Sequence, residues 1–184
     1  MEPINLDAAL DMARAGDQRG ITFLFRAFQP QLLRYLNHKT ADAAEDVASE
    51  TWMAAARGMS GFVGNSQDFR SWIFAIARRR LVDHYRRLGR RPQTVMLDSE
   101  LLTNTEGDVA EDVVAAMSSD EALALLVRDL SPDQAEVLVL RVVVGLSVAE
   151  VAGIMQRSAE SVRTLQHPAL CKLGDRWSEK TVTP

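Results

Sequence analysis

The densest group of side chains able to do chemistry is a run of cations in residues 70–91. Eight arginines lie in this segment, against a single acidic residue, Asp83. Arginine presents a permanently charged, planar group that suits phosphate, and neighbouring aromatic side chains offer flat faces for unstacked bases. So many cations exceed what solubility requires. The segment therefore predicts contact with the backbone of a nucleic acid.

A second candidate surface lies near the end of the chain. Ser147 and Glu150 have the spacing of a capping box, which marks the start of a helix, and Ser158 is placed to cap a second helix after a short turn. Two helices joined in this way form a helix-turn-helix, whose second helix enters the major groove of DNA. Val162 and Leu165 are expected to face the core. The side chains expected to face DNA are Ser161, Arg163, Thr164, Gln166 and His167.

Patterns typical of catalysis or metal binding are absent from the sequence. The three histidines are scattered, Cys171 has no neighbouring base, and no glycine-rich phosphate loop or metal-ligand spacing occurs. We therefore expect no enzyme activity, no metal, no cofactor and no small-molecule substrate. Cys171 is expected to be a small packing residue, and a lone cysteine is typical of a protein of the reducing cytoplasm.

The elements that must position these residues are expected to be helices. Apolar residues recur at spacings of three and four, and no segment alternates with period two for long enough to form a sheet. Pro30 is expected to kink or break the second helix, and residues 58–67 are expected to form an irregular loop. Before the helix-turn-helix, helices are expected over residues 5–16, 21–37, 41–57, 68–88, 120–130 and 131–145.

The helix expected over residues 68–88 has an apolar face as well as its arginines. Asp83 lies four residues from both Arg79 and Arg87, so we expect it to pair with one of them. The apolar residues at core spacing are Phe69, Trp72, Ile73, Ile76, Ala77, Leu81, Tyr85 and Leu88. This face is expected to pack in the core while the arginines stay in solvent.

The net charge of −4 is unevenly distributed along the chain. Residues 1–91 carry +4, residues 92–130 carry −8, and residues 131–184 are neutral. A basic working surface joined to an acidic connector explains this asymmetry. We predict an all-α protein of two small helical domains, residues 1–91 and 119–184, joined by a flexible acidic linker over residues 92–118.

Neither export nor membrane insertion is expected. No segment approaches the roughly 20 consecutive apolar residues that span a bilayer. The first residues are acidic and amphipathic, unlike a secretory signal. A cytoplasmic protein is therefore predicted.

Taken in order, three segments resemble the alternative sigma subunits of bacterial RNA polymerase, specifically the extracytoplasmic-function (ECF) group. Residues 44–52 (AEDVASETW) resemble the helix that docks on the polymerase. Residues 69–87 resemble the helix that melts promoters and recognises the −10 element, and residues 130–164 resemble the domain that binds the −35 element. Together these segments cover nearly all of the chain outside the linker.

The resemblance implies three working surfaces and several partners. Core RNA polymerase would bind through its clamp helices to Asp46, Glu50, Trp52 and Met53. Residues 61–91 would melt the −10 element of promoter DNA, residues 61–67 would capture a flipped base, and residues 147–170 would recognise the −35 element. The linker would thread through basic channels of the polymerase. An anti-sigma factor would control the activity of the sigma subunit. The residues implied in −10 binding are Asn65, Phe69, Trp72, Arg78, Arg79, Arg80, Arg86 and Arg87.

Three positions depart from the family pattern. Arg79 stands where the family commonly has Asn, and Ser49 stands where it commonly has Gln. Pro168 stands where the family usually has a basic residue that contacts −35 DNA. Because proline inside a helix removes one backbone hydrogen bond, we predict a bend near residues 164–168 and a weaker −35 affinity than that of a relative with arginine at this position.

An alternative function is a stand-alone transcriptional regulator that binds operator DNA as a dimer through the same helix-turn-helix. That alternative accounts for residues 131–177. It leaves without a role both the run of arginines and the docking residues Asp46, Glu50 and Met53. Binding to duplex DNA without polymerase separates the two, because a sigma subunit alone should bind weakly and a repressor strongly.

Overall fold

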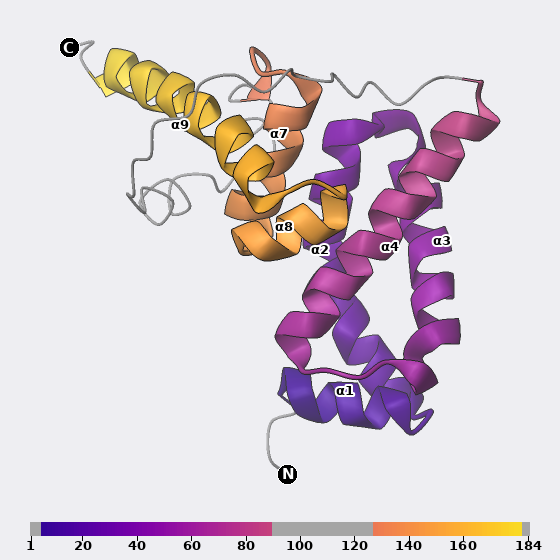
Figure 1. The fold of residues 1–184 in the computed structure, drawn as a ribbon. Coiled ribbons are helices and arrows are strands. Elements are labelled where there is room, and N and C mark those ends of the chain that lie inside the picture. Colours follow the sequence, from indigo (N-terminus) through magenta and orange to yellow (C-terminus); the bar gives the residue numbers. More distant parts are fainter. Residues whose placement is uncertain (1–4, 90–126, 182–184) are drawn as a thin grey trace. The chain divides into compact units, whose positions relative to one another are not determined.

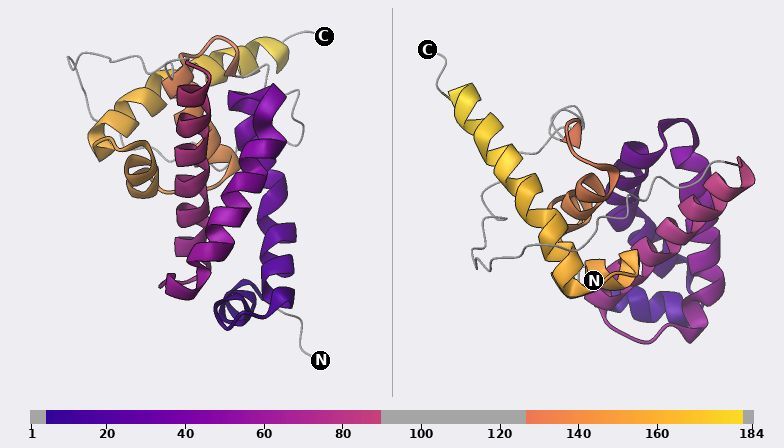
Figure 2. Two further views of the ribbon diagram at one scale, coloured as in Figure 1. Left: turned by 90° about the vertical axis from the view of Figure 1, so that its right-hand side faces the viewer. Right: turned by 45° about the horizontal axis from the view of Figure 1, so that its top comes forward.

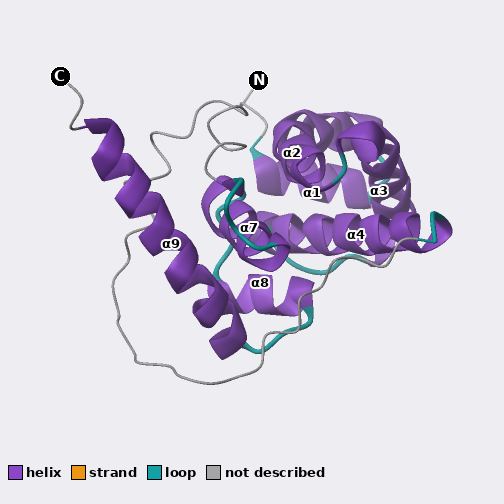
Figure 3. Ribbon diagram, turned by 90° about the horizontal axis from the view of Figure 1, so that it is seen from above, coloured by secondary structure: helices purple, strands orange, loops and turns teal. Residues whose placement is uncertain are grey.

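The computed structural model describes residues 5–89 and 127–181. The chain divides into two compact units, Met1–Pro92 and Gln93–Pro184. Figure 3 shows that every regular element among the described residues is a helix, so the fold is all-α. The linker expected over residues 92–118 and most of the helix expected over residues 120–130 lie outside the described residues.

Four helices form the first unit. They are α1 (Leu6–Arg14), α2 (Gln18–Lys39), α3 (Ala44–Gly58) and α4 (Ser66–Arg87). Helices α2, α3 and α4 run alongside one another, as the two views of Figure 2 show. Helix α1 lies across one end of this bundle (Figure 1) and contacts both α2 and α4.

The helix starts follow local capping chemistry. The side chain of Asn5 accepts from the amide of Ala8 and begins α1. Asp17 caps α2, and the hydrogen bond from the Arg19 side chain holds the pKa of the Asp17 carboxyl below its usual value. Each cap satisfies amides that have no partner within the helix.

Aromatic side chains fill the core of the first unit. The ring of Phe28 on α2 lies 5.4 Å from that of Phe69 on α4, and Tyr35 meets Phe74 at 5.7 Å. All four side chains are buried. Phe74 was not part of the expected apolar face, and it joins the core because α4 packs against both α2 and α3.

Helix α2 continues through Pro30 to Lys39, so the expected break is absent, and the kink stays a prediction. Two other expectations for this unit are wrong. Leu88 is 52% exposed instead of buried, because it lies just past the end of α4. The expected loop over residues 58–67 is partly regular, since a 3₁₀ turn, η2, occupies Met59–Gly61 and α4 already begins at Ser66.

The second unit contains α7 (Pro132–Leu138), a π-helical turn η3 (Val139–Val143), α8 (Val148–Met155) and α9 (Ala159–Thr181). Capping boxes begin two of its helices, one from Ser131 and one from Ser147 with Glu150. The predicted capping box at Ser147 is thus confirmed. Helix α9 runs on through Pro168 without a break, and the bend expected there stays a prediction.

A buried ion pair ties the turn of the helix-turn-helix to α7. Arg157 donates to the Asp133 carboxylate at 2.5 Å, and the Asp133 side chain is only 4% exposed. Gln156, just before Arg157, adopts a left-handed backbone with φ of 55° that ends α8. The pair places Arg157 against α7, so the turn has a fixed neighbour in the core of its own unit.

Candidate DNA and partner interfaces

Helix α4 presents its arginines in different states. Arg79, Arg86 and Arg87 are exposed, whereas Arg78 and Arg80 are half-buried. The Arg80 Nε atom is buried without a hydrogen-bond partner among the described residues. Both exposed and half-buried arginine side chains of α4 therefore carry guanidinium groups, as expected for a surface that follows phosphates.

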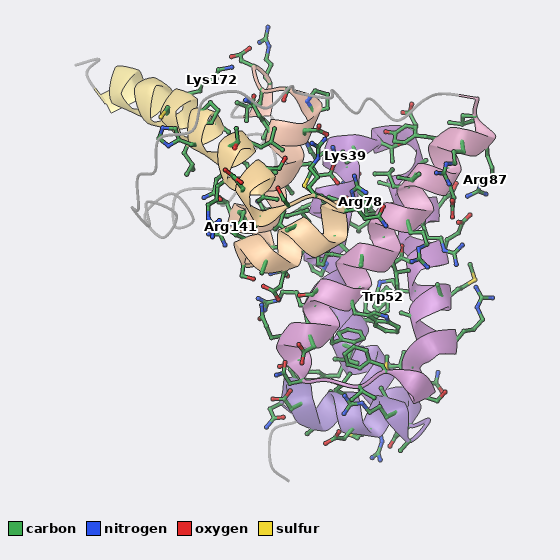
Figure 4. All side chains as sticks on the ribbon, viewed as in Figure 1. Lys39, Trp52, Arg78, Arg87, Arg141 and Lys172 are labelled. Carbon is green, nitrogen blue, oxygen red and sulfur yellow. The ribbon has the colours of Figure 1, made fainter. Side chains whose placement is uncertain are left out.

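The predicted partner of Asp83 is wrong. The Asp83 carboxylate lies 3.7 Å from Arg86, three residues along the helix, and not against Arg79 or Arg87. The Arg87 side chain instead reaches α3, where it donates to both carboxylate oxygens of Glu50 at 3.0 and 3.1 Å. Figure 4 shows Arg87 near the C-terminal end of α4. A residue expected to bind polymerase is thus paired with a residue expected to bind DNA.

Helix α3 carries the expected docking residues on an accessible face. Asp46 is exposed, and Met53 is 53% exposed. Trp52 is half-buried, because its indole N–H donates to Gln29 Oε1 at 2.7 Å and its ring lies 5.2 Å from Phe25. Phe25 is itself 42% exposed. The surface is therefore acidic with an apolar patch beside it, made jointly by α2 and α3.

The segment between α3 and α4 contains both aromatic and capping residues. Asn65 is the N-cap of α4, and its side-chain oxygen accepts from the amides of Gln67 and Asp68. The ring centres of Phe62 and Trp72 lie 4.9 Å apart, with the two ring planes tilted by 36°, and both side chains are half-buried. These two rings form a platform at the start of α4, suited to stacking against a base.

The expectation that Phe69 binds DNA is contradicted. Its side chain is 0% exposed and packs between Phe28 and Phe62. Phe69 therefore supports the Phe62–Trp72 platform from beneath and cannot reach a nucleic acid.

Helix α1 also contacts this segment, which the sequence did not indicate. Arg14 Nε donates to the carbonyl of Phe62 at 3.1 Å, and its Nη2 donates to the carbonyl of Gly64. The Asp7 carboxylate accepts from the Ser66 amide at 2.8 Å. These partners are 48 to 59 residues apart, and no local pattern could have shown them.

The second candidate surface lies on α9. Val162 and Leu165 are buried, which confirms the expected inward face. Arg163 and His167 are exposed, while Ser161, Thr164 and Gln166 are half-buried. Thr164 and Gln166 have partners within the protein. Thr164 Oγ1 donates to the Glu160 carbonyl at 2.9 Å, and Gln166 Oε1 accepts from Arg141 at 3.3 Å.

Cys171 does not pack in the core, and that expectation is wrong. Its side chain is exposed, one turn beyond His167, with the sulfur 3.8 Å from the imidazole Nε2. Among the described residues, no group of three or more histidine, cysteine or acidic side chains is arranged to hold a metal ion. In the same part of the chain, no helix is long and apolar enough to cross a bilayer.

Two parts of the chain match known family models. Residues 24–91 match the model described as Sigma-70 region 2, and residues 120–173 match the model described as Sigma-70, region 4. The first match includes α3, α4 and the segment between them. The second includes the helix-turn-helix.

Full-length relatives show the same similarity. The chain is 32% identical to the ECF RNA polymerase sigma factor ShbA of Streptomyces griseus, over 91% of this chain and 93% of that protein. It is 31% identical to the RNA polymerase sigma factor YlaC of Bacillus subtilis, over 82% and 87% respectively. It is also 32% identical to the ECF RNA polymerase sigma factor BldN of Streptomyces coelicolor, over 88% of this chain, but spans only 61% of that protein's length.

A solved structure has the same fold. The chain superposes on CnrH, solved in complex with the cytosolic domain of CnrY, with a TM-score of 0.63. The match covers 95% of this chain and 99% of that one at 23% identity. This likeness concerns the fold alone.

Proposed function

Since this chain belongs to the ECF group of the sigma-70 family and is a sigma factor that directs RNA polymerase to promoters, we propose which of its surfaces carries each step. Docking on core polymerase uses the exposed face of α3, recognition and melting of the −10 element use α4 with the preceding segment, and recognition of the −35 element uses α9. Such a subunit supplies specificity to the polymerase and does not itself catalyse.

The observation that carries the proposal is the pairing of two different surfaces within the first unit. Helix α3 exposes Asp46 and Met53, which suit a basic surface with apolar contacts. Helix α4 carries the Phe62–Trp72 platform at its start and exposed arginines further along. A protein that only bound DNA would need the second surface and not the first.

In the proposed melting step, the arginines of α4 hold the phosphates of the separated strand. Flipping a base out of the duplex costs a few kcal/mol, and stacking on an aromatic ring returns about 1–3 kcal/mol per base. The Phe62–Trp72 platform could offer such stacking, because both rings are half-buried and therefore partly open to solvent. Arg79 lies on the exposed face of α4 and is the arginine we expect to contact phosphate most directly.

In the proposed −35 step, Arg163 and His167 contribute the exposed donors of α9. Arginine commonly donates two hydrogen bonds to guanine in the major groove. Thr164, next to Arg163 in the sequence, is half-buried and adds a methyl group. Gln166 is held by Arg141 and is better placed to support α9 than to reach a base.

The docking assignment is tested by reversing charge on α3. Asp46→Lys, combined with Met53→Ala, should weaken binding to core polymerase by about tenfold, because it repels a basic partner and removes an apolar contact. Asp42→Lys, an equally exposed acidic residue before α3, is the matched control and should leave the affinity nearly unchanged. Equal losses for both variants would show that only overall charge matters.

Run-off transcription with bacterial core polymerase across genomic promoters tests the function as a whole. Added chain should support initiation at a defined subset of promoters, and binding to duplex DNA without core should be weak. Strong operator binding without polymerase would favour the dimeric regulator, which leaves the match of residues 24–91 to Sigma-70 region 2 unexplained.

We also propose that the protein acts in the cytoplasm, with its polymerase, and that an anti-sigma factor controls it. The apolar patch of Phe25, Trp52 and Met53 is the surface we expect such a regulator to cover. A regulator bound there would compete directly with core polymerase. Its addition should lower run-off transcription, and excess core polymerase should restore it.

A further inference from the structure

Helix α1 precedes the part of the chain that matches Sigma-70 region 2, which begins at residue 24. It nevertheless contacts η2 and α4, the two elements on either side of residues 62–65. Figure 1 shows the connecting segment running over α1 before it enters α4. We call residues 62–66 the platform loop, because they lead from Phe62 of the Phe62–Trp72 platform into α4.

Arg14, the last residue of α1, holds the platform loop at two carbonyls. Its Nε donates to Phe62 and its Nη2 donates to Gly64. The guanidinium also lies 5.3 Å from the centre of the Phe62 ring. Asp11 fixes the same group from its other side, with Nη1 2.8 Å from the Asp11 carboxylate. The guanidinium is therefore oriented before it meets the loop.

Asp7 holds the platform loop at a third point, by accepting from the Ser66 amide. Between these points, Gly64 has φ of 145°, a conformation that side-chain-bearing residues rarely adopt. A Cβ at this position would also lie 2.6 Å from the Asp68 side chain. Arg14 and Asp7 thus hold the loop backbone at residues 62, 64 and 66. The positive φ of Gly64 sets the course of the backbone between these contacts.

The platform loop exposes one large apolar side chain, that of Val63. Val63 is 91% exposed, the most exposed large apolar side chain among the described residues. It lies in the sequence between Phe62 and Gly64, the two residues whose carbonyls Arg14 holds. An exposed apolar side chain on a fixed backbone can favour one base over another, for example through the methyl group of thymine.

Contacts other than those of Arg14 also hold α1 to the protein. Ala9, Leu10 and Ala13 are buried against the bundle, and Gly20 allows α1 and α2 to approach closely. The Nε and Nη2 donors of Arg14 are directed to the loop. Holding a binding segment in one conformation before it meets its ligand reduces the ordering cost of binding.

We infer that α1 is part of the −10 reader, with Arg14 and Asp7 as positioning residues that fix the platform loop, and Val63 as the loop residue that contacts DNA and sets base preference. This inference rests on the proposed function of α4 and the platform. Arg14 acts through the loop backbone and makes no contact with DNA itself.

The test measures base preference position by position. Holoenzymes reconstituted with wild-type chain, Arg14→Ala and Arg14→Lys select from one pool of promoter DNA in which the −35 and −10 elements are randomised. In Arg14→Ala, preference at one or two adjacent −10 positions should fall about fivefold or more, with −35 preferences unchanged. Arg14→Lys keeps the charge but cannot bond both carbonyls with a fixed fork, so it should resemble Arg14→Ala.

Arg19→Ala is the matched control, since Arg19 is an exposed arginine that pairs with Asp17 in the cap of α2. It should keep every wild-type preference. Asp7→Ala removes only the contact at Ser66 and should flatten the same −10 positions more weakly. Val63→Ser should change preference at those positions without lowering the unfolding temperature, because its side chain contacts solvent.

A purely structural role for Arg14 gives a different pattern. Loss of fold lowers the active fraction and therefore the total DNA bound, but it leaves relative base preferences intact. If Arg14→Ala binds less DNA yet keeps wild-type preference at every position, or if Arg14→Lys behaves as wild type, the inference is overturned. A wild-type holoenzyme without any −10 preference would overturn the proposed function itself, and this inference with it.

Discussion

Single residues differ in what they offer to a partner, even within one run of arginines. Arg87 is bound to Glu50 across α3 and α4, and Arg86 lies near Asp83. Exposed pairs of this kind contribute only about 0–1 kcal/mol. A phosphate or a basic partner can therefore replace either member at small cost. Docking of polymerase on Glu50 would release Arg87 for DNA.

The first prediction concerns this pair. Glu50→Gln removes the carboxylate, so Arg87 becomes available, and the weak affinity of the free chain for duplex DNA should rise about threefold at low salt. The rise should vanish as salt screens the charges. Fluorescence anisotropy with labelled duplex measures both. Glu45→Gln, an exposed glutamate on the same helix, makes the same charge change, and an equal rise there would refute the release of Arg87.

The second prediction concerns Pro168, which is exposed on α9. Pro168→Arg should raise −35 affinity about tenfold, because it adds a cation beside His167 and restores a backbone donor. Pro168→Ala restores only the donor and should give a smaller gain. Transcription from promoters with intact and scrambled −35 elements separates the two effects. Unchanged promoter binding by Pro168→Arg would contradict the prediction.

At the scale of elements, two glycines show how closely helices approach. Gly20 lies where α2 meets α1, and a Cβ there would lie 2.6 Å from the Ala13 nitrogen and closer still to the Ala9 carbonyl oxygen. Gly153 lies in α8 with nothing within 4 Å of a Cβ. Both are helical glycines, but the first permits a packing contact and the second does not.

The third prediction follows from that contrast. Gly20→Ala should lower the free energy of unfolding of the first unit by about 1–3 kcal/mol, because the backbone of α1 must move. Gly153→Ala should raise that of the second unit by about 0.5–1 kcal/mol through helix propensity. Hydrogen exchange of the full chain resolves the two units. A neutral Gly20→Ala would show that α1 is loosely held, contrary to the platform-loop clamp.

At the scale of the whole molecule, the two surfaces that we propose to bind DNA belong to separate compact units. Arg79 lies on one and Arg163 on the other, and both are exposed. Groups without shared partners generally have additive energetic effects. The division of the promoter between the units therefore has a quantitative consequence.

The fourth prediction is additivity. Arg79→Ala and Arg163→Ala should each weaken promoter binding by holoenzyme about tenfold, within the 1–3 kcal/mol of one good contact. The double variant should equal the product of the two, as measured by titration of a fluorescent promoter. On DNA with a scrambled −35 element, Arg163→Ala should have little further effect. A double variant no weaker than either single variant would show that the two residues act as one site.

Much of this protein could be predicted from the sequence alone, because the signals involved are local. The capping box predicted from Ser147 and Glu150 lies within four residues of the helix it starts. The inward face of α9 follows the helical repeat through Val162 and Leu165. The order of motifs was enough to indicate the family, since each motif is a short stretch of chain.

The tertiary structure decided the contacts between distant segments. Arg14 with the platform loop, Arg87 with Glu50, Trp52 with Gln29 and Arg157 with Asp133 join residues 23 to 50 positions apart. Helical periodicity shows which side of a helix is apolar, but not which neighbour covers it. Periodicity placed Phe69 in the core correctly, whereas the family resemblance implied that it binds DNA. Helix α1 was given no role, although it contacts the platform loop.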